Sequence, residues 1–240
     1  MLILGLDSSA VAGSCALCEI SGEKKTVIAS SFVNTKLTHS QTLMPMVEDM
    51  LKSSGSELND IDLFAVNSGP GSFTGIRIGV AAVKGIAFAL GKPCVGVSTL
   101  HSLAYNLAGF NCIACTVMDA RCNQFYNALF DLKDEKISRL TPDRAISASD
   151  LAEELNKYSG KKIIFAGDGA ELAYRSINTE NIALAPLTIR LQRAENVCLA
   201  AASEYESVTA RKLLPAYLRL PQAERERLAK INEKNTEEKQ

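Results

Sequence analysis

The stretch Asn67-Ser68-Gly69-Pro70-Gly71-Ser72-Phe73-Thr74-Gly75-Ile76-Arg77-Ile78-Gly79 lies between an apolar run at 62–66, typical of a strand, and a longer one at 74–90, typical of a helix. A glycine-rich turn at such a junction presents free backbone N–H groups at the start of the helix, which suits an anion. Three familiar motifs do not fit. No Lys-Ser/Thr pair follows Gly75 as in a Walker A loop, the glycines lack the dinucleotide-binding spacing, and Ser72 lacks the flanking glycines of a nucleophile elbow.

The composition describes a chain with a large core and little net charge. It has 240 residues, 47% of them hydrophobic, and a formal net charge of −1. A nucleic-acid-binding surface usually carries a clear basic excess, so we expect any contact with RNA to be indirect. The seven cysteines are odd in number and dispersed, and the first residues, MLILGLDSS, have no basic leader. These features favour a cytoplasmic protein with reduced cysteines and no membrane association.

The order of expected elements repeats along the chain. Strand-like runs at 2–6, 14–20 and 26–33 precede a helix at 40–54 and a strand at 60–67, and a similar series begins at residue 112. Asp7 and Asp119 each end the first strand of their series, which indicates an internal duplication with two lobes facing a cleft. We expect a first lobe at 1–108, a second lobe at 109–193, a closing helix and returning extended segment at 194–220, and a flexible charged tail at 221–240.

Four segments in order resemble one protein family. They are LILGLDSS (2–9), HSQTLMPMVEDML (39–51), SGPGSFTGIRIG (68–79) and LLPAYLR (213–219). Together they resemble the TsaB (YeaZ) family. The resemblance implies an α/β, two-lobed fold like that of actin and the sugar kinases, with duplicated RNase H-like lobes.

The resemblance also implies a function. TsaB-like proteins are non-catalytic subunits that are required for threonylcarbamoyl transfer to adenosine 37 of bacterial tRNA, and they dock and stabilise the transferase TsaD. Three further features are expected from the family. TsaE joins the complex, the chain forms a homodimer when TsaD is absent, and the chain binds no cofactor of its own, with ATP or ADP expected only at the complex interface. The alternative is an enzyme of the same fold, either an ATP-dependent transferase or a degenerate metalloprotease-like enzyme.

Two helices are expected to form the partner-binding surface. Small residues spaced by three or four positions share one face of the helix at 74–90, and such a stripe permits close approach of another backbone. The helix at 40–54 adds an apolar, methionine-rich stripe. Packing inside the same lobe is the alternative for both stripes. The expected partner-binding residues are Leu43, Met46, Val47, Met50, Gly75, Gly79, Ala82 and Gly85.

A second group of residues is expected at a nucleotide or phosphate. Asp7 and Ser8 follow the first strand, Gly71 and Ser72 belong to the glycine loop, and Arg77 stands near the start of the following helix. A carboxylate at a strand end suits a metal–phosphate site in this fold, although Asp and Ser also stabilise ordinary turns. Arg77 could equally be a solvated or ion-paired surface residue.

We expect no metal site. Two C-x-x-C units, at 15–18 and 112–115, lie in expected strands, where residues three apart point to opposite faces and cannot converge on one ion. TsaD carries an H-x-x-x-H metal pair after its fifth strand, and the resemblance places Thr99 and Leu103 at those two positions. His101 is out of register with the pair by two residues, and the chain has only one other histidine.

Overall fold

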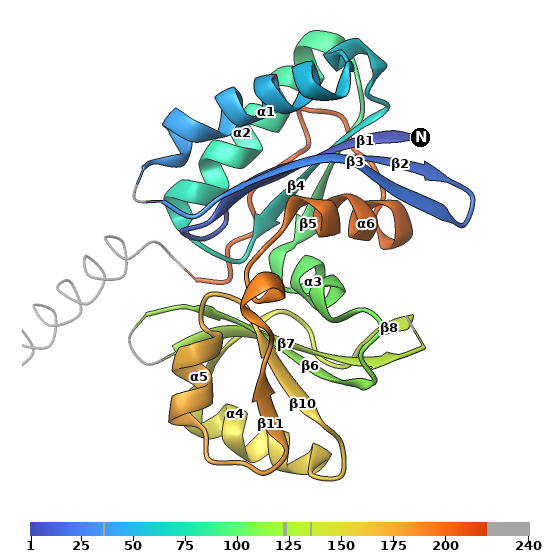
Figure 1. Cartoon of the computed structure of the whole chain (residues 1–240). Helices are drawn as coiled ribbons and strands as arrows, with labels where there is room; N and C mark the ends of the chain where they lie inside the picture. Colours follow the sequence, from blue (N-terminus) through green and yellow to red (C-terminus); the bar gives the residue numbers. More distant parts are fainter. Residues whose placement is uncertain (36, 122–123, 135, 220–240) are drawn as a thin grey trace, which may run out of the picture.

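The first lobe is built on a mixed five-stranded sheet. The computed structural model describes residues 1–35, 37–121, 124–134 and 136–219, and it places two α/β lobes one above the other (Figure 1). The strand order in the first sheet is β3-β2-β1-β4-β5. The elements of this lobe are β1 (Leu2–Asp7), β2 (Gly13–Ser21), β3 (Lys24–Val33), α1 (His39–Ser54), β4 (Leu63–Gly69), α2 (Phe73–Leu90), β5 (Cys94–Ser98) and α3 (Thr99–Ala104).

The second lobe has a six-stranded sheet of closely related design. Its strand order is β11-β10-β6-β7-β8, and β9 pairs with β7 off this path. After this lobe the chain crosses back and forms α6 against the first sheet. The remaining elements are β6 (Cys112–Asp119), β7 (Gln124–Lys133), β8 (Lys136–Arg139), β9 (Arg144–Ser147), α4 (Ala148–Leu155), β10 (Ile163–Ala166), α5 (Ala170–Ser176), β11 (Ile182–Leu184) and α6 (Ala194–Glu204).

The two sheets share one topology. In the first, β1 is antiparallel to β2 and parallel to β4, which is parallel to β5. In the second, β6 is antiparallel to β7 and parallel to β10, which is parallel to β11. The predicted internal duplication is therefore present, and β1 and β6 are equivalent first strands. Their final residues, Asp7 and Asp119, occupy equivalent strand ends.

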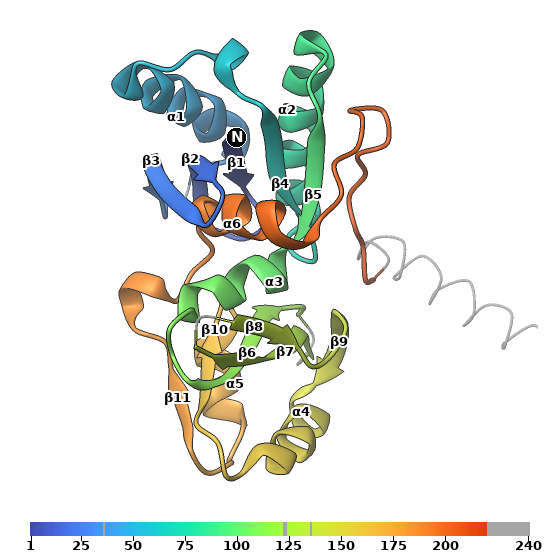
Figure 2. The ribbon, with the colours of Figure 1, turned by 90° about the vertical axis from the view of Figure 1, so that its right-hand side faces the viewer.

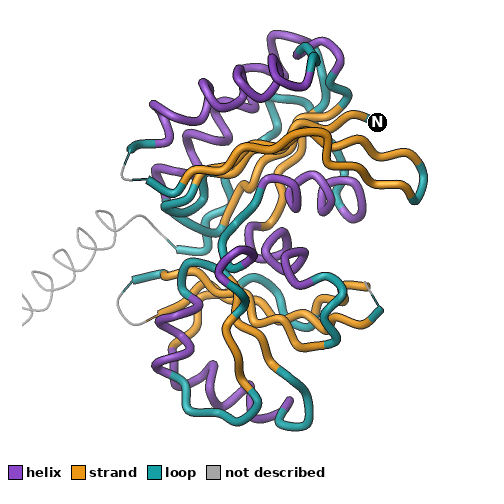
Figure 3. Tube along the Cα trace, in the orientation of Figure 1, coloured by secondary structure: helices purple, strands orange, loops and turns teal. Residues whose placement is uncertain are grey.

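Helices cover both faces of the first sheet. α1 and α2 pack on one face around Leu4, Leu17 and Phe64, while α6 covers the other face (Figure 2). α3 lies between the lobes and packs on β6 and β7, and α4 and α5 cover the remaining face of the second sheet. The tube in Figure 3 shows the same layers, with helices on either side of each set of strands.

The cysteines confirm the predicted strand placement. Cys15 and Cys18 lie in β2 and Cys112 and Cys115 in β6, and all four are buried. Cys15 belongs to the core beneath α1 and α2, whereas Cys18 belongs to the core beneath α6. Residues three apart in these strands therefore do point to opposite faces.

The chain after α6 returns along the first lobe. Val208 pairs with Cys94 at the outer edge of β5, through N–O distances of 2.9 and 2.7 Å. The segment then passes α2, where the Lys84 ammonium donates to the carbonyls of Arg211 and Leu213. The segment from Val208 to Leu213 thus lies against β5 and α2. The charged tail expected at 221–240 lies outside the described residues.

Candidate functional site

The glycine loop is packed against the chain's own backbone. The Ser8 hydroxyl donates to the Gly75 carbonyl at 2.8 Å, and a methyl group on Gly75 would overlap the Ser8 carbonyl oxygen. The Ser72 N–H donates to the Ser9 carbonyl at 2.7 Å, and the Ser72 hydroxyl caps α2 by accepting from the Gly75 N–H at 3.2 Å. Small residues here allow β1 and α2 to approach closely.

The other glycines of the loop serve the same packing. Gly69 and Gly71 have φ of 135° and 156°, in the region that favours glycine. A methyl group on Gly69 would overlap the Ala216 carbonyl, and one on Gly71 would overlap the Ser9 carbonyl. Ala216 also donates its N–H to the Ser68 carbonyl at 2.7 Å. The loop is thus lined by the returning segment and by the end of β1.

Asp7 is fully buried beside this loop. Its Oδ1 accepts from the Ser9 N–H at 2.9 Å, and its Oδ2 has no hydrogen-bond partner among the described residues. Burial raises the pKa of the Asp7 carboxyl group, while the hydrogen bonds from Ser9, the Asn67 side chain and the charge of His39 act in the opposite direction. The Asp7 carboxyl group is therefore sealed inside the lobe rather than open to a ligand.

Arg77 is engaged by aromatic side chains. Its Nε donates to the Tyr217 hydroxyl at 2.8 Å, and its guanidinium lies 3.8 Å from the centre of the Phe73 ring. The Phe73 and Tyr217 rings are themselves stacked, with centroids 4.8 Å apart. Of the residues expected at a nucleotide or phosphate, Asp7, Ser8, Gly71 and Ser72 come together, and Arg77 instead fastens the returning segment to α2.

The structure corrects the expected exposure of the partner-binding stripes. Gly75 and Gly79 are buried, and a methyl group on Gly79 would lie 2.5 Å from the Ser8 Oγ. Ala82 is partly exposed, while Gly85 is exposed and has no atom within 4 Å of an added Cβ. The stripe of α1 packs in the core against the first sheet; its buried members are Leu43, Met46, Val47 and Met50.

The physical reason is that both stripes face the sheet. An amphipathic helix presents its largest apolar stripe to the nearest core, and here that core belongs to the same lobe. Small residues on α2 allow close approach to Ser8 and Val66 instead of to a partner. A larger side chain at Gly79 is therefore expected to disturb the packing of this lobe itself. The exposed apolar or small residues of these helices include Met44 on α1 and Ala81, Gly85 and Ala89 on α2.

The second lobe carries an acidic pair to which the sequence reasoning gave no role. Asp168 follows β10 and lies near Asp119, at the end of the adjacent parallel strand β6. The surrounding protein raises the pKa of Asp168 to about 6, the charge of Asp119 adds to the rise, and hydrogen bonds from backbone N–H groups and Gln192 oppose it. The Asp168 residue is nevertheless exposed to solvent, so its carboxyl group can reach water. The sequence signal that could have identified this pair is the position of Asp119, which ends β6 as Asp7 ends β1.

His101 lies in an aromatic cage between the lobes. Its ring stacks on Phe130 with centroids 5.5 Å apart, and Nδ1 is 3.1 Å from the Tyr205 hydroxyl. Nearby, the Ser98 hydroxyl donates to the Asp143 carboxylate at 2.5 Å, and Asp143 also pairs with Arg139. His101 is thus engaged by aromatic neighbours and stands beside a polar link from β5 to the second lobe. In the part of the chain that the structure describes, no three His, Cys, Asp or Glu side chains are grouped to hold a metal.

Comparisons with known proteins agree over nearly the whole chain. A family model for TsaD, tRNA N6-adenosine threonylcarbamoyltransferase, matches residues 27–228. The tRNA threonylcarbamoyladenosine biosynthesis protein TsaB of Bacillus subtilis is 31% identical over 93% of this chain and 96% of its own length. The corresponding Escherichia coli protein is 29% identical over 91% of this chain and 95% of its own length.

A solved structure adds the fold. YeaZ from Pseudomonas aeruginosa superposes with a TM-score of 0.77 at 28% sequence identity, covering 90% of this chain and 99% of that chain. The chain belongs to the TsaB (YeaZ) family and has its two-lobed, actin-like α/β fold.

Proposed function

We propose that this chain is a non-catalytic subunit of the machinery that forms threonylcarbamoyladenosine at position 37 of tRNA, where it docks and stabilises a TsaD-type transferase. The observation that carries the proposal is the match to Bacillus subtilis TsaB, which is 31% identical and spans almost the full length of both chains. In this proposal TsaE joins the complex, ATP or ADP binds at the complex interface, and tRNA reaches this subunit only through its partners.

Internal contacts support a role without catalysis. The loop residues that could hold a phosphate are used inside the lobe, as the Ser8–Gly75 hydrogen bond and the full burial of Asp7 illustrate. Arg77 is held by Tyr217. The N–H and the carbonyl of Ala216 both lie against the glycine loop. A ligand at this loop would therefore have to displace the returning segment. These contacts favour an assembly role over ATP-dependent transfer.

The docking surface that we propose is the solvent-facing side of α1 and α2. Met44 is 41% exposed on α1, and Ala81, Gly85 and Ala89 form a small-residue stripe on α2 beside the buried one. A glycine inside a helix costs about 1 kcal/mol relative to alanine. No neighbour inside the lobe requires Gly85 to be small. A partner helix that packs closely on this stripe would require a small residue at Gly85. In this proposal a second copy of the chain binds the same stripe when TsaD is absent.

The test combines binding with activity. The chain is co-purified with the TsaD of the same organism, and threonylcarbamoyl transfer to tRNA is measured with and without it. We expect no transfer by the chain alone and transfer by the complex. Gly85→Leu should weaken association with TsaD roughly tenfold to hundredfold, because overpacking costs about 1–3 kcal/mol.

A matched substitution separates docking from folding. Gly160→Leu adds the same side chain at an open position of the second lobe, where nothing lies within 4 Å of an added Cβ. It should leave association unchanged, and both variants should keep the circular dichroism spectrum of the unmodified chain. Turnover by the isolated chain would refute the non-catalytic role. Normal association of Gly85→Leu would refute the proposed docking surface.

A further inference from the structure

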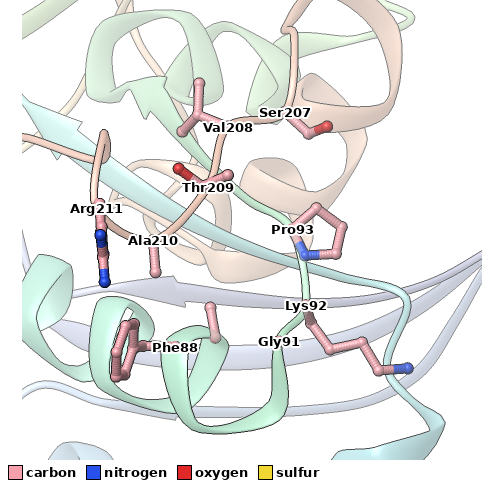
Figure 4. A pocket seen from close by; sticks show the side chains of 10 residues that line it. Phe88, Gly91, Lys92, Pro93, Ser207, Val208, Thr209, Ala210 and Arg211 are labelled. Atoms are coloured by element: carbon pink, nitrogen blue, oxygen red, sulfur yellow. The ribbon is translucent and has the colours of Figure 1, made fainter.

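A groove on the first lobe, away from the glycine loop, lies between the end of α2 and the returning segment. Its volume is about 580 Å³, within the roughly 300–1,000 Å³ of typical ligand pockets. Its walls are mainly apolar and come from Ala87, Pro93, Val208 and Ala210. Phe88 and Arg211 lie at one end and Lys92 at the other (Figure 4).

The side chains that line the groove include two cations, Lys92 and Arg211, and no Asp or Glu, although Glu206 directly precedes the lining residue Ser207. Residues 73–98 and residues 207–219 contain no Asp or Glu, although the whole chain has a net charge of −1. The acidic residues that offset these cations therefore lie in other segments of the chain. The cations on these two segments are Arg77, Lys84 and Lys92 on the first and Arg211, Lys212 and Arg219 on the second.

The Arg211 charge is available to a partner. Its guanidinium lies 6.0 Å from the centre of the Phe88 ring, and it has no ion pair with any carboxylate in the described part of the chain. Arg211 and Lys212 are both exposed. Lys84 and Lys92, by contrast, donate to backbone carbonyls: Lys84 joins α2 to the returning segment at Arg211 and Leu213, and Lys92 donates to Asn59. Arg211 therefore marks the end of the groove where an anion would bind, and the exposed Lys212 follows it in the chain.

Exposed apolar side chains come from the same two segments that form the groove. Phe88, in the groove wall, is 63% exposed, and Leu214, three residues after Arg211, is 67% exposed. Exposed apolar side chains beside a groove are typical of a protein-binding surface. Exposed leucines give little to a phosphate backbone, whereas they match the apolar side chains of a peptide. The combination of an apolar groove with unpaired cations at its rim thus favours a peptide over RNA.

We infer that this groove binds an acidic segment of a partner protein, in which one or two apolar side chains are flanked by Asp or Glu. The apolar side chains would lie on Phe88, Pro93 and Ala210, and the carboxylates would face Arg211 and Lys212. The groove lies where α2 meets the returning segment, and α1 lies on the other side of α2 (Figure 2). The residues named for the TsaD docking surface, Met44, Ala81, Gly85 and Ala89, are not among those that line the groove. The inference does not depend on the proposed function.

The probe is a labelled peptide, Glu-Leu-Asp-Phe-Glu, added to the ¹⁵N-labelled full chain. Amide shifts should be concentrated at residues 87–93 and 207–212, and binding measured by fluorescence anisotropy should weaken as salt is added. A peptide with Lys at the three acidic positions, and one with Ser at the two apolar positions, should each bind at least about tenfold more weakly.

Variants of the chain give the second half of the test. Arg211→Glu should weaken peptide binding by about tenfold or more, and Phe88→Ser should weaken it to a similar degree. Lys157→Glu makes the same charge reversal at an exposed position of the second lobe and should have no effect. Circular dichroism checks that each variant is folded.

Three outcomes would overturn the inference. They are the absence of shifts at millimolar peptide, shifts located elsewhere, and equal binding of the acidic and basic peptides. An oligouridine run in parallel tests nucleic acid: binding of the RNA at this groove without binding of the peptide would replace the peptide assignment.

Discussion

Gly79 and Gly85 stand six residues apart on α2 and have opposite surroundings. An added Cβ on Gly79 would lie 2.5 Å from the Ser8 Oγ and 3.2 Å from the Val66 Cγ2. An added Cβ on Gly85 would have no atom within 4 Å. Identical residues on one helix thus serve different purposes. The first is needed for packing inside the lobe, and the second is free to serve an outside contact.

This difference gives a prediction about stability. Gly79→Leu should lower the free energy of unfolding by about 1–3 kcal/mol, because the new side chain overpacks the contact between α2 and β1. Gly85→Leu should not lower it and should raise it by up to about 1 kcal/mol, because leucine favours the helix more than glycine does. Urea unfolding followed by circular dichroism measures both. Equal values for the two variants would contradict this account of α2.

A second residue-scale prediction concerns Asp168, whose pKa is raised to about 6 by the surrounding protein and by Asp119. The folded state then binds a proton more tightly than the unfolded state, whose Asp has a pKa near 3.8. This contribution to stability is present below about pH 4 and is lost as the pH rises through about 6. Asp119→Asn should lower the pKa of Asp168, because it removes a like charge. NMR titration of the side-chain carboxyl carbons measures the change, and an unchanged pKa would exclude coupling between the two carboxylates.

At the scale of elements, α2 is held on two sides. One side packs on β4, and the other contacts the returning segment through Arg77, Phe73 and Tyr217. Among the described residues, the segment makes one isolated bridge to β5, at Val208, and one backbone hydrogen bond to the end of β4, from Ala216 to Ser68. Side-chain contacts to α2 therefore carry much of its attachment.

Removing Tyr217 tests this attachment. Tyr217→Ala deletes the stacked pair with Phe73 and the acceptor for Arg77, and aromatic pairs contribute about 0.5–1.5 kcal/mol. Amide hydrogen exchange in residues 214–219 should therefore accelerate by about two- to tenfold. Tyr174→Ala removes a similarly exposed tyrosine from α5 and should leave this segment unchanged. Unaltered exchange in Tyr217→Ala would show that the backbone contacts suffice.

Most elements could be predicted from the sequence, because their signals are local. The helix predicted at 40–54 is α1, His39–Ser54, and the expected closing helix is α6, Ala194–Glu204. Gly55 and Gly91 end α1 and α2 in the left-handed conformation, as glycine permits. The environment of each helix face was not predictable in this way. Whether Met46 or Gly79 meets its own sheet or a partner depends on contacts distant in sequence, such as that with Ser8.

The candidate site was predicted less well for the same reason. The sequence placed Ser72 and Gly71 correctly beside the end of β1, but it gave no sign that Ala216 would pack on Gly69. Arg77 was expected near a phosphate because it is close to the glycine loop in sequence. On a helix its side chain instead projects toward the returning segment and meets Tyr217.

At the scale of the whole molecule, the two lobes are joined by a polar link beside α3. Ser98 at the end of β5 donates to Asp143 of the second lobe, and Arg139 pairs with the same carboxylate at 2.6 Å. The Arg139 guanidinium also lies 4.7 Å from the Phe130 ring centre, beside His101. These contacts connect the end of β5 in the first lobe with Phe130 in the core of the second lobe.

Loss of the central carboxylate should loosen the connection between the lobes. Asp143→Ala removes the acceptor of the half-buried Ser98 hydroxyl and the ion-pair partner of Arg139, which keeps its hydrogen bond to the Thr141 carbonyl. The loss should cost about 1 kcal/mol, because Arg139 is exposed. Calorimetry should show a lower melting temperature. Ser98→Ala removes only one contact and should have a smaller effect, and a double-mutant cycle gives the coupling between the two residues. Additive effects of the two substitutions would contradict a shared link.

The return of the chain to its first lobe has a consequence for synthesis on the ribosome. One face of the first sheet, which includes Ile3 and Ala16, is covered by α6. Translation reaches Ala194 only after the whole second lobe has been made. The second sheet is contiguous in sequence and can close as it emerges, whereas the strands made first must keep an apolar face uncovered until nearly the end. The N-terminal half of this protein is therefore the part that a nascent-chain chaperone would hold longest.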